Sequence, residues 1–184
     1  MKIIAFTGMP CSGKSEAVAI AKEMKIPVVR MGDAVWEETK RRGLELTDKN
    51  VGTVANEMRE SNGKDIWARL TVEKIHVSLL SVECVIIDGI RNVEEIDTFK
   101  TMLGHNFILI AIEASDGIRQ KRALQRKRTD DSSSLNDIKA RDQRELGWGL
   151  GAVFAVADII VPNDGRVEDF HKKIKQVLKD VMKR

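Results

Sequence analysis

An eight-residue segment near the start of the chain has the residue types and spacing of a loop that binds phosphate groups. The segment, a complete G-x-x-x-x-G-K-[ST] pattern, reads Gly8-Met9-Pro10-Cys11-Ser12-Gly13-Lys14-Ser15. Gly8 and Gly13 permit backbone conformations that a side chain would obstruct, so backbone amides can converge on phosphate oxygens. Lys14 can then contact the β- and γ-phosphates of ATP, and the Ser15 hydroxyl can bind Mg²⁺. We therefore predict an ATP and Mg²⁺ site here; a tight turn with an incidental lysine is the alternative interpretation.

Three further candidate residues follow short apolar segments. Val85-Ile86-Ile87 places Asp88 at the carboxyl end of a predicted strand, where its carboxylate can support Mg²⁺ through water or cap the next helix. Arg91 can contact an acceptor phosphate or the transferring phosphoryl group, or form a surface salt bridge. Asp33, at the end of the second predicted strand, can orient or deprotonate an acceptor hydroxyl, or cap the helix that follows.

A cluster of arginines occupies two predicted helices in the second half of the chain. Its members are Arg119, Arg122, Arg126, Arg128, Arg141 and Arg144. Phosphoryl transfer depends mainly on positive charge around the γ-phosphate, so two such helices joined by a polar loop can close over a triphosphate as a lid. The alternatives are a solvated basic face and a surface that contacts RNA.

Short apolar segments alternate with amphipathic segments and must position these side chains. We interpret five apolar segments as strands: Lys2–Thr7, Pro27–Met31, Val82–Ile87, Phe107–Ile112 and Asp158–Val161. Helical periodicity indicates helices at Lys14–Met24, Val93–Leu103, Ile118–Arg128, Leu135–Leu146 and Val167–Lys183, with residues 34–80 mostly helical. The alternation predicts an α/β fold in three layers, with a parallel five-stranded sheet flanked by helices.

We expect one domain, residues 1–184, made of three parts. The core takes residues 1–31, 82–118 and 157–184, a helical acceptor-binding insert takes about 33–80, and a lid takes about 119–147.

Composition narrows the classes of partner. The chain has 184 residues and a net charge of +3, which is too small to indicate duplex DNA or a membrane surface. Its longest apolar stretches, Phe107–Ile112 and Leu150–Ala157, are far shorter than the ~18 residues of a membrane helix, and no secretory signal is expected. Cys11 and Cys84 have neither metal-binding nor disulfide spacing, which favours the cytoplasm; Cys11 is interpreted as a small residue at a variable loop position.

The motifs together resemble those of P-loop nucleoside monophosphate kinases and dephospho-CoA kinase, and most of all an archaeal adenylate-kinase-related branch. Met31-Gly32-Asp33 is similar to the S-G-D segment of adenylate kinases, and Asp88-Gly89-Ile90-Arg91 is similar to their D-G-F-P-R, one residue shorter. Arg128-x-Asp130-Asp131 resembles the lid signature R-x-D-D. The segment 157–165 is similar to the A-D-x-V-I-x-N-x-G of dephospho-CoA kinases, which lies beside adenine.

The resemblance covers nearly the whole chain and implies a P-loop NTPase fold with the following roles. Lys14 and Ser15 would hold ATP and Mg²⁺, Asp88 would support the metal, and Arg91 would bind the acceptor. Arg128 and Arg141 would stabilise the transferring phosphoryl group, with Asp33 at the acceptor. The nucleotide contacts would come from Gly8, Met9, Pro10, Cys11, Ser12, Gly13, Lys14, Ser15, Arg122, Arg126, Asn163 and Gly165.

Departures from the family pattern concern the acceptor. Trp36 stands where adenylate kinases have an arginine, and no proline precedes Arg91, so AMP is disfavoured. Arg59 and the turn at Gly63–Trp67 either bind the acceptor or form an ordinary helix junction.

The expected function is ATP-dependent phosphoryl transfer to a small phosphorylated or nucleotide-like acceptor, of the nucleoside monophosphate kinase or dephospho-CoA kinase type. A kinase-like ATPase switch that acts on an RNA or ribosome-assembly partner is the alternative. The chain has no N-K-x-D motif, which argues against a GTPase, and its first turn lacks the G-x-G-x-x-G of dinucleotide dehydrogenases.

Overall fold

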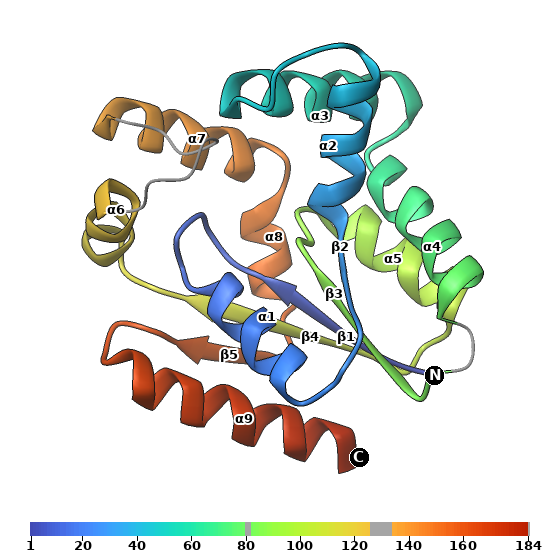
Figure 1. The fold of residues 1–184 in the computed structure, drawn as a ribbon, viewed down its shortest axis with the longest axis vertical. Coiled ribbons are helices and arrows are strands. Elements are labelled where there is room, and N and C mark those ends of the chain that lie inside the picture. Colours follow the sequence, from blue (N-terminus) through green and yellow to red (C-terminus); the bar gives the residue numbers. More distant parts are fainter. Residues whose placement is uncertain (80–81, 126–133, 184) are drawn as a thin grey trace.

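A parallel sheet forms the centre of the molecule in the computed structural model, which describes residues 1–79, 82–125 and 134–183 (Figure 1). The strand order is β2-β3-β1-β4-β5, and every neighbouring pair is parallel. The strands are β1 (Lys2–Thr7), β2 (Val28–Arg30), β3 (Cys84–Asp88), β4 (Phe107–Glu113) and β5 (Ile159–Pro162). The predicted five-stranded parallel sheet is therefore confirmed.

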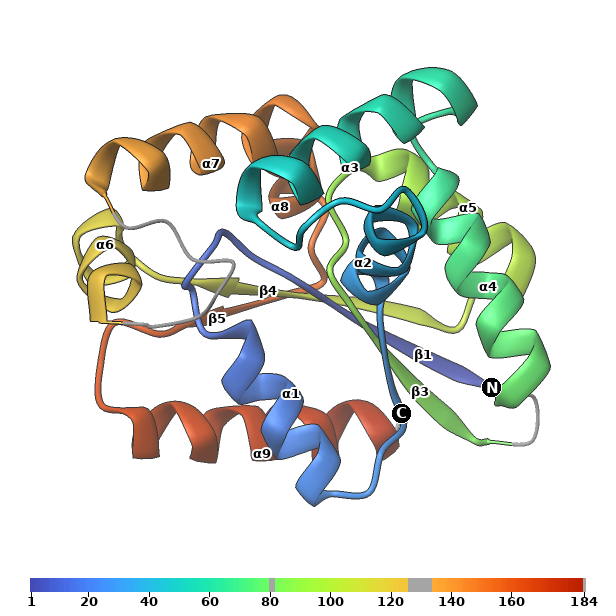
Figure 2. The same ribbon diagram turned by 45° about the horizontal axis from the view of Figure 1, so that its top comes forward.

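Helices cover both faces of the sheet. On one face lie α1 (Lys14–Glu23) and α9 (Val167–Lys183), and on the other lie α4 (Ile66–Ser78), α5 (Val93–Leu103) and α8 (Leu150–Ala155) (Figures 1 and 2). The remaining helices surround the end of the sheet that carries the phosphate-loop segment: α2 (Met31–Arg41), α3 (Asp48–Asn62), α6 (Asp116–Gln125) and α7 (Leu135–Gly147). The arrangement is the expected three-layer α/β fold.

The strands are apolar because both faces of the sheet are buried. In β1, Ile3 and Ala5 pack into the core under α4 and α5, whereas Ile4 and Phe6 pack into the core under α1 and α9. Successive strand side chains point to opposite faces, so an almost continuous apolar strand serves two cores at once. No residue of this strand from Ile3 to Thr7 is exposed.

Side-chain caps fix where several helices begin. Asn92 and Glu95 form a reciprocal capping box at the start of α5, in which Asn92 Oδ1 accepts from Glu95 N at 2.8 Å. Helix α2 differs, because it begins directly after β2 and its N-cap residue, Arg30, makes no side-chain capping bond. The second strand is consequently shorter than predicted and ends at Arg30. Helix α8, within the apolar stretch after Gly149, is an element that the sequence pattern did not predict.

Candidate functional site

The phosphate-loop segment connects β1 to α1, and close packing explains both of its glycines. At Gly8, where φ is +151°, a Cβ would lie 2.5 Å from Ile112 O and 2.6 Å from Ser12 Oγ. At Gly13, where φ is +113°, a Cβ would lie 2.2 Å from Asn163 Nδ2. No other residue type fits either position without moving its neighbours. Cys11 also has a positive φ, 61°, a strained conformation that is typical of functional loops.

Asn163 and Arg122 connect this loop to the turn that follows β5. Asn163 is 4% exposed and its Nδ2 donates to Ser12 O at 2.8 Å. Arg122, on α6, donates to Asn163 O at 2.8 Å and to Ser12 O at 3.4 Å. Two residues predicted to contact nucleotide therefore lie against the phosphate loop, whereas Gly165 is exposed in the same turn.

Lys14 turns back onto its own loop. Its Nζ donates to the carbonyl oxygens of Gly8 and Met9. Burial is the largest influence on this ammonium and, with the nearby Arg91 charge, lowers its pKa from 10.5 to about 7, against the opposing charges of Glu145 and Asp88. An anionic phosphate at this place would favour the charged lysine.

Asp88 ends β3 beside the phosphate loop. In the sheet register it pairs with Phe6 of β1 and with Arg30 of β2, whose Nε lies 3.9 Å from Asp88 Oδ2. Its Oδ1 is buried and has no hydrogen-bond partner among the described residues. Because Asn92 caps α5, Asp88 does not have the capping role that was its alternative. Buried Thr7 Oγ1 donates to Ile90 O at 2.9 Å and fixes the following turn to β1.

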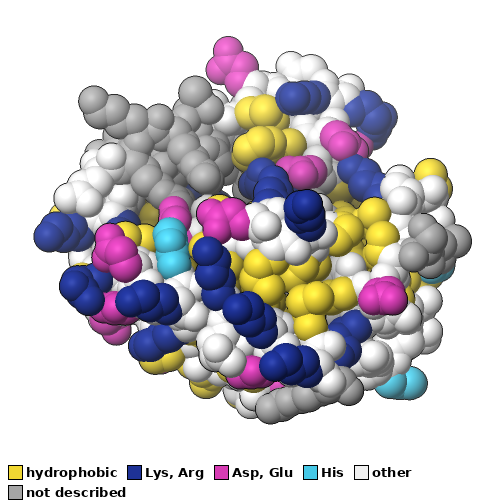
Figure 3. Space-filling view, turned by 60° about the horizontal axis from the view of Figure 1, so that its bottom comes forward, with side chains coloured by type: hydrophobic (Ala, Val, Ile, Leu, Met, Phe, Trp, Pro, Cys, Tyr) yellow, Lys and Arg dark blue, Asp and Glu magenta, His cyan; other side chains and the backbone are white. Residues whose placement is uncertain are grey.

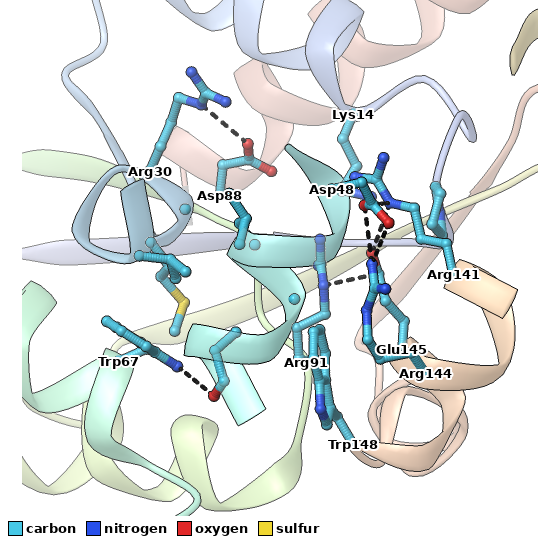
Figure 4. A pocket seen from close by; sticks show the side chains of 18 of the residues that line it. Lys14, Arg30, Asp48, Trp67, Asp88, Arg91, Arg141, Arg144, Glu145 and Trp148 are labelled. Atoms are coloured by element: carbon cyan, nitrogen blue, oxygen red, sulfur yellow. Dashed lines mark hydrogen bonds and ion pairs between the residues drawn. The ribbon is translucent and has the colours of Figure 1, made fainter. Parts of the chain in front are cut away.

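A cavity of about 190 Å³ lies between the phosphate loop, α2, α3 and α7 (Figure 4). Its walls combine cations, carboxylates and flat aromatic surfaces. The cations are Lys14, Arg30, Arg59, Arg91, Arg141 and Arg144; the carboxylates are Asp48, Asp88 and Glu145; the aromatic side chains are Trp36, Trp67 and Trp148. An excess of positive charge in a largely enclosed space suits an anionic ligand.

Glu145 of α7 is the central carboxylate of this cavity. It is 3% exposed, and its Oε2 lies 2.8 Å from Arg91 Nε while its Oε1 lies 3.5 Å from Arg141 Nε. Burial opposes its ionisation, but the charges of Arg91, Lys14, Arg141 and Arg144 together hold its pKa below the usual value. Arg91 is therefore part of a buried ion pair and not of a surface salt bridge.

Asp48, the first residue of α3, joins that helix to α7. Its carboxylate accepts from Arg144 Nη2 at 2.9 Å and lies 3.5 Å from Arg141 Nε. These contacts bring α7 over the cavity (Figure 4). The protein's own carboxylates thus neutralise the arginines that were expected to contact phosphate groups.

Arg119 has a different role from the one that a basic helix suggests. It is 3% exposed, its Nη1 donates to Pro10 O at 3.2 Å, and its guanidinium pairs with Asp116 and Asp142. The side chain links the phosphate loop to α7 instead of facing solvent.

Not every predicted site residue reaches the cavity. Asp33 lies in the first turn of α2, 3.5 Å from Arg30 Nη1, and does not line the cavity. Arg126, Arg128 and the pair Asp130-Asp131 lie outside the described residues.

Sequence reasoning did not select three residues that the fold brings here. Asp48 lies in the segment 34–80, which was predicted only as mostly helical, although its place after the N-cap Thr47 marks a helix start. Glu145 lies four residues after Arg141, a spacing that puts both on one helix face. Trp148 follows α7 and had no motif of its own.

The residues present fit ATP and Mg²⁺. The loop offers amides, a lysine and the Ser15 hydroxyl, and Asp88 offers its buried Oδ1, which has no hydrogen-bond partner within the described ranges. Mg²⁺ usually takes one or two protein oxygens and completes its shell with water and phosphate oxygens. In the described part of the chain, no group of three or more His, Cys, Asp or Glu side chains is placed to hold a metal.

The fold and this site define a P-loop kinase-like protein. Residues 7–139 match a family model described as an AAA domain. A shikimate kinase from Aquifex aeolicus superposes over 96% of both chains with a TM-score of 0.53 and 20% identity. A gluconokinase from Sinorhizobium meliloti covers 99% of this chain and 94% of its own, with a TM-score of 0.62 and 17% identity. At such identities the likeness concerns the fold.

Sequence relatives identify the family. The chain is 43% identical over 183 residues to a UPF0200 protein from Methanosarcina barkeri, of which it covers 97%. It is 50% identical over 178 residues to a UPF0200/UPF0201 protein from Archaeoglobus fulgidus, of which it spans only 55% of the length. The chain therefore belongs to the UPF0200 family, in agreement with the resemblance to an archaeal kinase-related branch. In the described residues, no helix is long and apolar enough to span a membrane.

Proposed function

We propose that this protein transfers the γ-phosphoryl group of ATP to a small phosphorylated or nucleotide-like acceptor. One observation carries the proposal: Lys14 of the phosphate loop and Asp88 line the same cavity as Arg91, Arg141 and an aromatic wall. A site built only for ATP hydrolysis needs no second compartment beyond the phosphate loop. Here that compartment is cationic, as an anionic acceptor requires.

The proposed roles follow from position. The loop amides and Lys14 bind the phosphates, and Ser15 and Asp88 hold Mg²⁺, which would neutralise charge on the phosphate oxygens. Arg122 and Asn163 stand at the nucleotide side of the loop, with Gly165 and Arg126 assigned there from the family pattern. Arg91 and Arg141 stabilise charge at the transferring group. Arg128 at that group and Asp33 at the acceptor hydroxyl are assigned from the family pattern alone, because Arg128 lies outside the described residues and Asp33 does not line the cavity.

The acceptor's own nature is constrained by the cavity walls. Trp36 lines the cavity with Arg30, whose guanidinium lies 5.4 Å from the indole centroid. This arrangement offers a flat surface in place of the arginine of adenylate kinases, and we infer an acceptor other than AMP.

A transfer assay tests the function. The protein is incubated with Mg²⁺, γ-labelled ATP and a panel of nucleoside monophosphates, nucleosides and dephospho-CoA. Shikimate and gluconate are added because structural neighbours are a shikimate kinase and a gluconokinase. Label on one acceptor supports the proposal and names the substrate class, whereas label released only as phosphate contradicts it.

A switch ATPase is the second candidate, and one surface favours it. The face on the side of α9 carries many Lys and Arg side chains (Figure 3). Helix α9 itself has exposed lysines, among them Lys172, Lys173, Lys179 and Lys183. Such a surface suits RNA. Acidic side chains lie among them, however, and Arg119 and Arg122 contact the phosphate loop. We place either activity in the cytoplasm, consistent with two free cysteines.

A further inference from the structure

Arg59, on α3, is a buried cation that its protein partners satisfy only in part. It is 9% exposed and lines the cavity. Its Nη2 donates to Glu95 Oε1 at 3.0 Å, but Nε and Nη1 are buried and have no hydrogen-bond partner among the described residues. Buried polar groups in native proteins are almost always paired, so two unpaired donors on one guanidinium require an explanation.

Glu95 does not account for the presence of Arg59. Its Oε2 accepts from Arg91 N at 2.7 Å and from Asn92 N at 3.4 Å, and the second bond belongs to the capping box of α5. A glutamine would perform that capping role without a charged partner. The capping of α5 therefore does not require the charge of Arg59.

Trp148 completes the surroundings of Arg59. The Arg59 guanidinium lies 4.4 Å from the indole centroid, and Trp148 Nε1 donates to Asn56 Oδ1 at 3.2 Å, which holds the ring in place. Stacking on an indole leaves the in-plane N–H donors of a guanidinium directed away from the ring. The aromatic face therefore does not replace the missing partners.

Trp148 lies away from Lys14 in the view of Figure 4, and Arg59 is placed with Trp148 by the contact with its ring. In the view of Figure 4, Arg91 and Glu145 stand between Lys14 and Trp148. Arg91 and Glu145 also influence the pKa of both Lys14 and Arg59, which agrees with this intermediate position. The cavity thus has a transfer end and a distal end.

We propose that Arg59 and Trp148 form a subsite for a phosphate or carboxylate group, which the acceptor carries at the end away from the atom that receives the phosphoryl group. The N–H donors on Nε and Nη1 point along different edges of the guanidinium, because Cδ lies between them, so each can donate separately to an oxygen of such an anion. Trp148 forms the wall beside it. That the anion belongs to the phosphoryl acceptor rests on the proposed function, whereas the existence of an anion site does not.

Calorimetric titration tests the subsite without any turnover. The protein is saturated with Mg²⁺ and a non-hydrolysable ATP analogue, which fills the phosphate loop, and is titrated with inorganic phosphate and, separately, with malonate. We expect one of these probes to bind at a single site. Phosphate alone would indicate a phosphorylated acceptor, and malonate alone would indicate a carboxylate.

Variants that remove the charge of Glu95 or of Arg59 should change the anion affinity in opposite directions. Glu95→Gln keeps the capping bonds but frees Arg59 from its counter-charge, so the anion should bind at least about tenfold more tightly, or 1.4 kcal/mol. Arg59→Met should lower affinity at least about tenfold. Because that variant leaves Glu95 buried and unpaired, the double variant Arg59→Met/Glu95→Gln keeps the test valid if the single variant does not fold.

Arg41→Met serves as the matched control, because it removes an arginine that pairs with Glu38 outside the cavity. Its anion affinity should equal that of the wild type. Wild-type affinity in Arg59→Met/Glu95→Gln, or no binding of either probe to the wild type, would overturn the subsite. Anion binding that depends on Arg59, in a protein that phosphorylates nothing in the transfer assay, would keep the subsite and reject the proposed function.

Discussion

Replacing Glu145 with glutamine should lower the stability of the protein without ligand and, at the same time, raise its affinity for nucleotide. The carboxylate is 3% exposed and lies 2.8 Å from Arg91 Nε and 3.5 Å from Arg141 Nε. Glutamine has nearly the same volume and keeps one acceptor oxygen, but it removes the negative charge that these cations and Lys14 share. Arg91, Lys14, Arg141 and Arg144 then remain close together with less negative charge to compensate them.

The size of the effect follows from the burial of the pair. Breaking a buried ion pair costs about 3–5 kcal/mol, and we expect about 2–3 kcal/mol here because glutamine keeps a polar oxygen beside the guanidinium groups. For a chain of this size, each kcal/mol lowers Tm by about 2–4 °C, so Tm of the free variant should fall by about 4–12 °C. An ATP analogue brings negative charge to the same cations, and each 1.4 kcal/mol of recovered stability means about tenfold tighter binding.

Thermal unfolding with and without a saturating Mg²⁺–ATP analogue measures both halves of this prediction. The wild type and Glu94→Gln, which changes an exposed ion pair with Lys64, provide the comparison. The control should change stability by less than about 1 kcal/mol. An equal loss of stability in free and saturated Glu145→Gln would refute the reasoning, because it would show that the ligand does not reach these cations.

Three further predictions follow from the phosphate loop and the lid. Lys14 has a folded-state pKa of about 7, below its unfolded value of 10.5, so the unfolded chain binds more protons between these values. The free energy of unfolding of the wild type relative to Lys14→Met should therefore rise with pH from 7 to 10.5 in urea titrations; a flat difference would contradict burial of the ammonium. Gly13→Ala should be destabilised by at least about 1–2 kcal/mol and lose ATP affinity, whereas Gly117→Ala, in the open on α6, should be neutral or slightly stabilised in the same unfolding and binding assays. Arg128→Ala should lower kcat more than ATP affinity, because its charge matters most in the transition state; equal losses would argue against a lid role.

Local sequence determined what could be predicted of this protein. The strands could be located because burial on both faces leaves short apolar runs such as Lys2–Thr7. The phosphate loop could be located because its glycines and Lys14 act within eight neighbouring residues. The division into core, insert and lid was drawn from the same patterns and stays a prediction.

The cavity could not be predicted from local sequence, because its ion pairs join distant parts of the chain. Asp48 and Arg144 are 96 residues apart, and Arg59 and Glu95 are 36 residues apart. Nothing near Arg119 in the sequence shows that it is buried against Pro10, 109 residues away. Only the packing of α3, α6 and α7 around the loop determines which arginines line the cavity, which pair with carboxylates and which, among the described residues, keep donor atoms without a hydrogen bond.

Transfer of label from γ-labelled ATP by the wild type and by Lys14→Ala tests the central claim most directly. With the acceptor found in the panel, the wild type should form labelled product, and Lys14→Ala should be at least about 10²-fold slower with an unchanged circular dichroism spectrum. Full turnover by that folded variant would contradict the account.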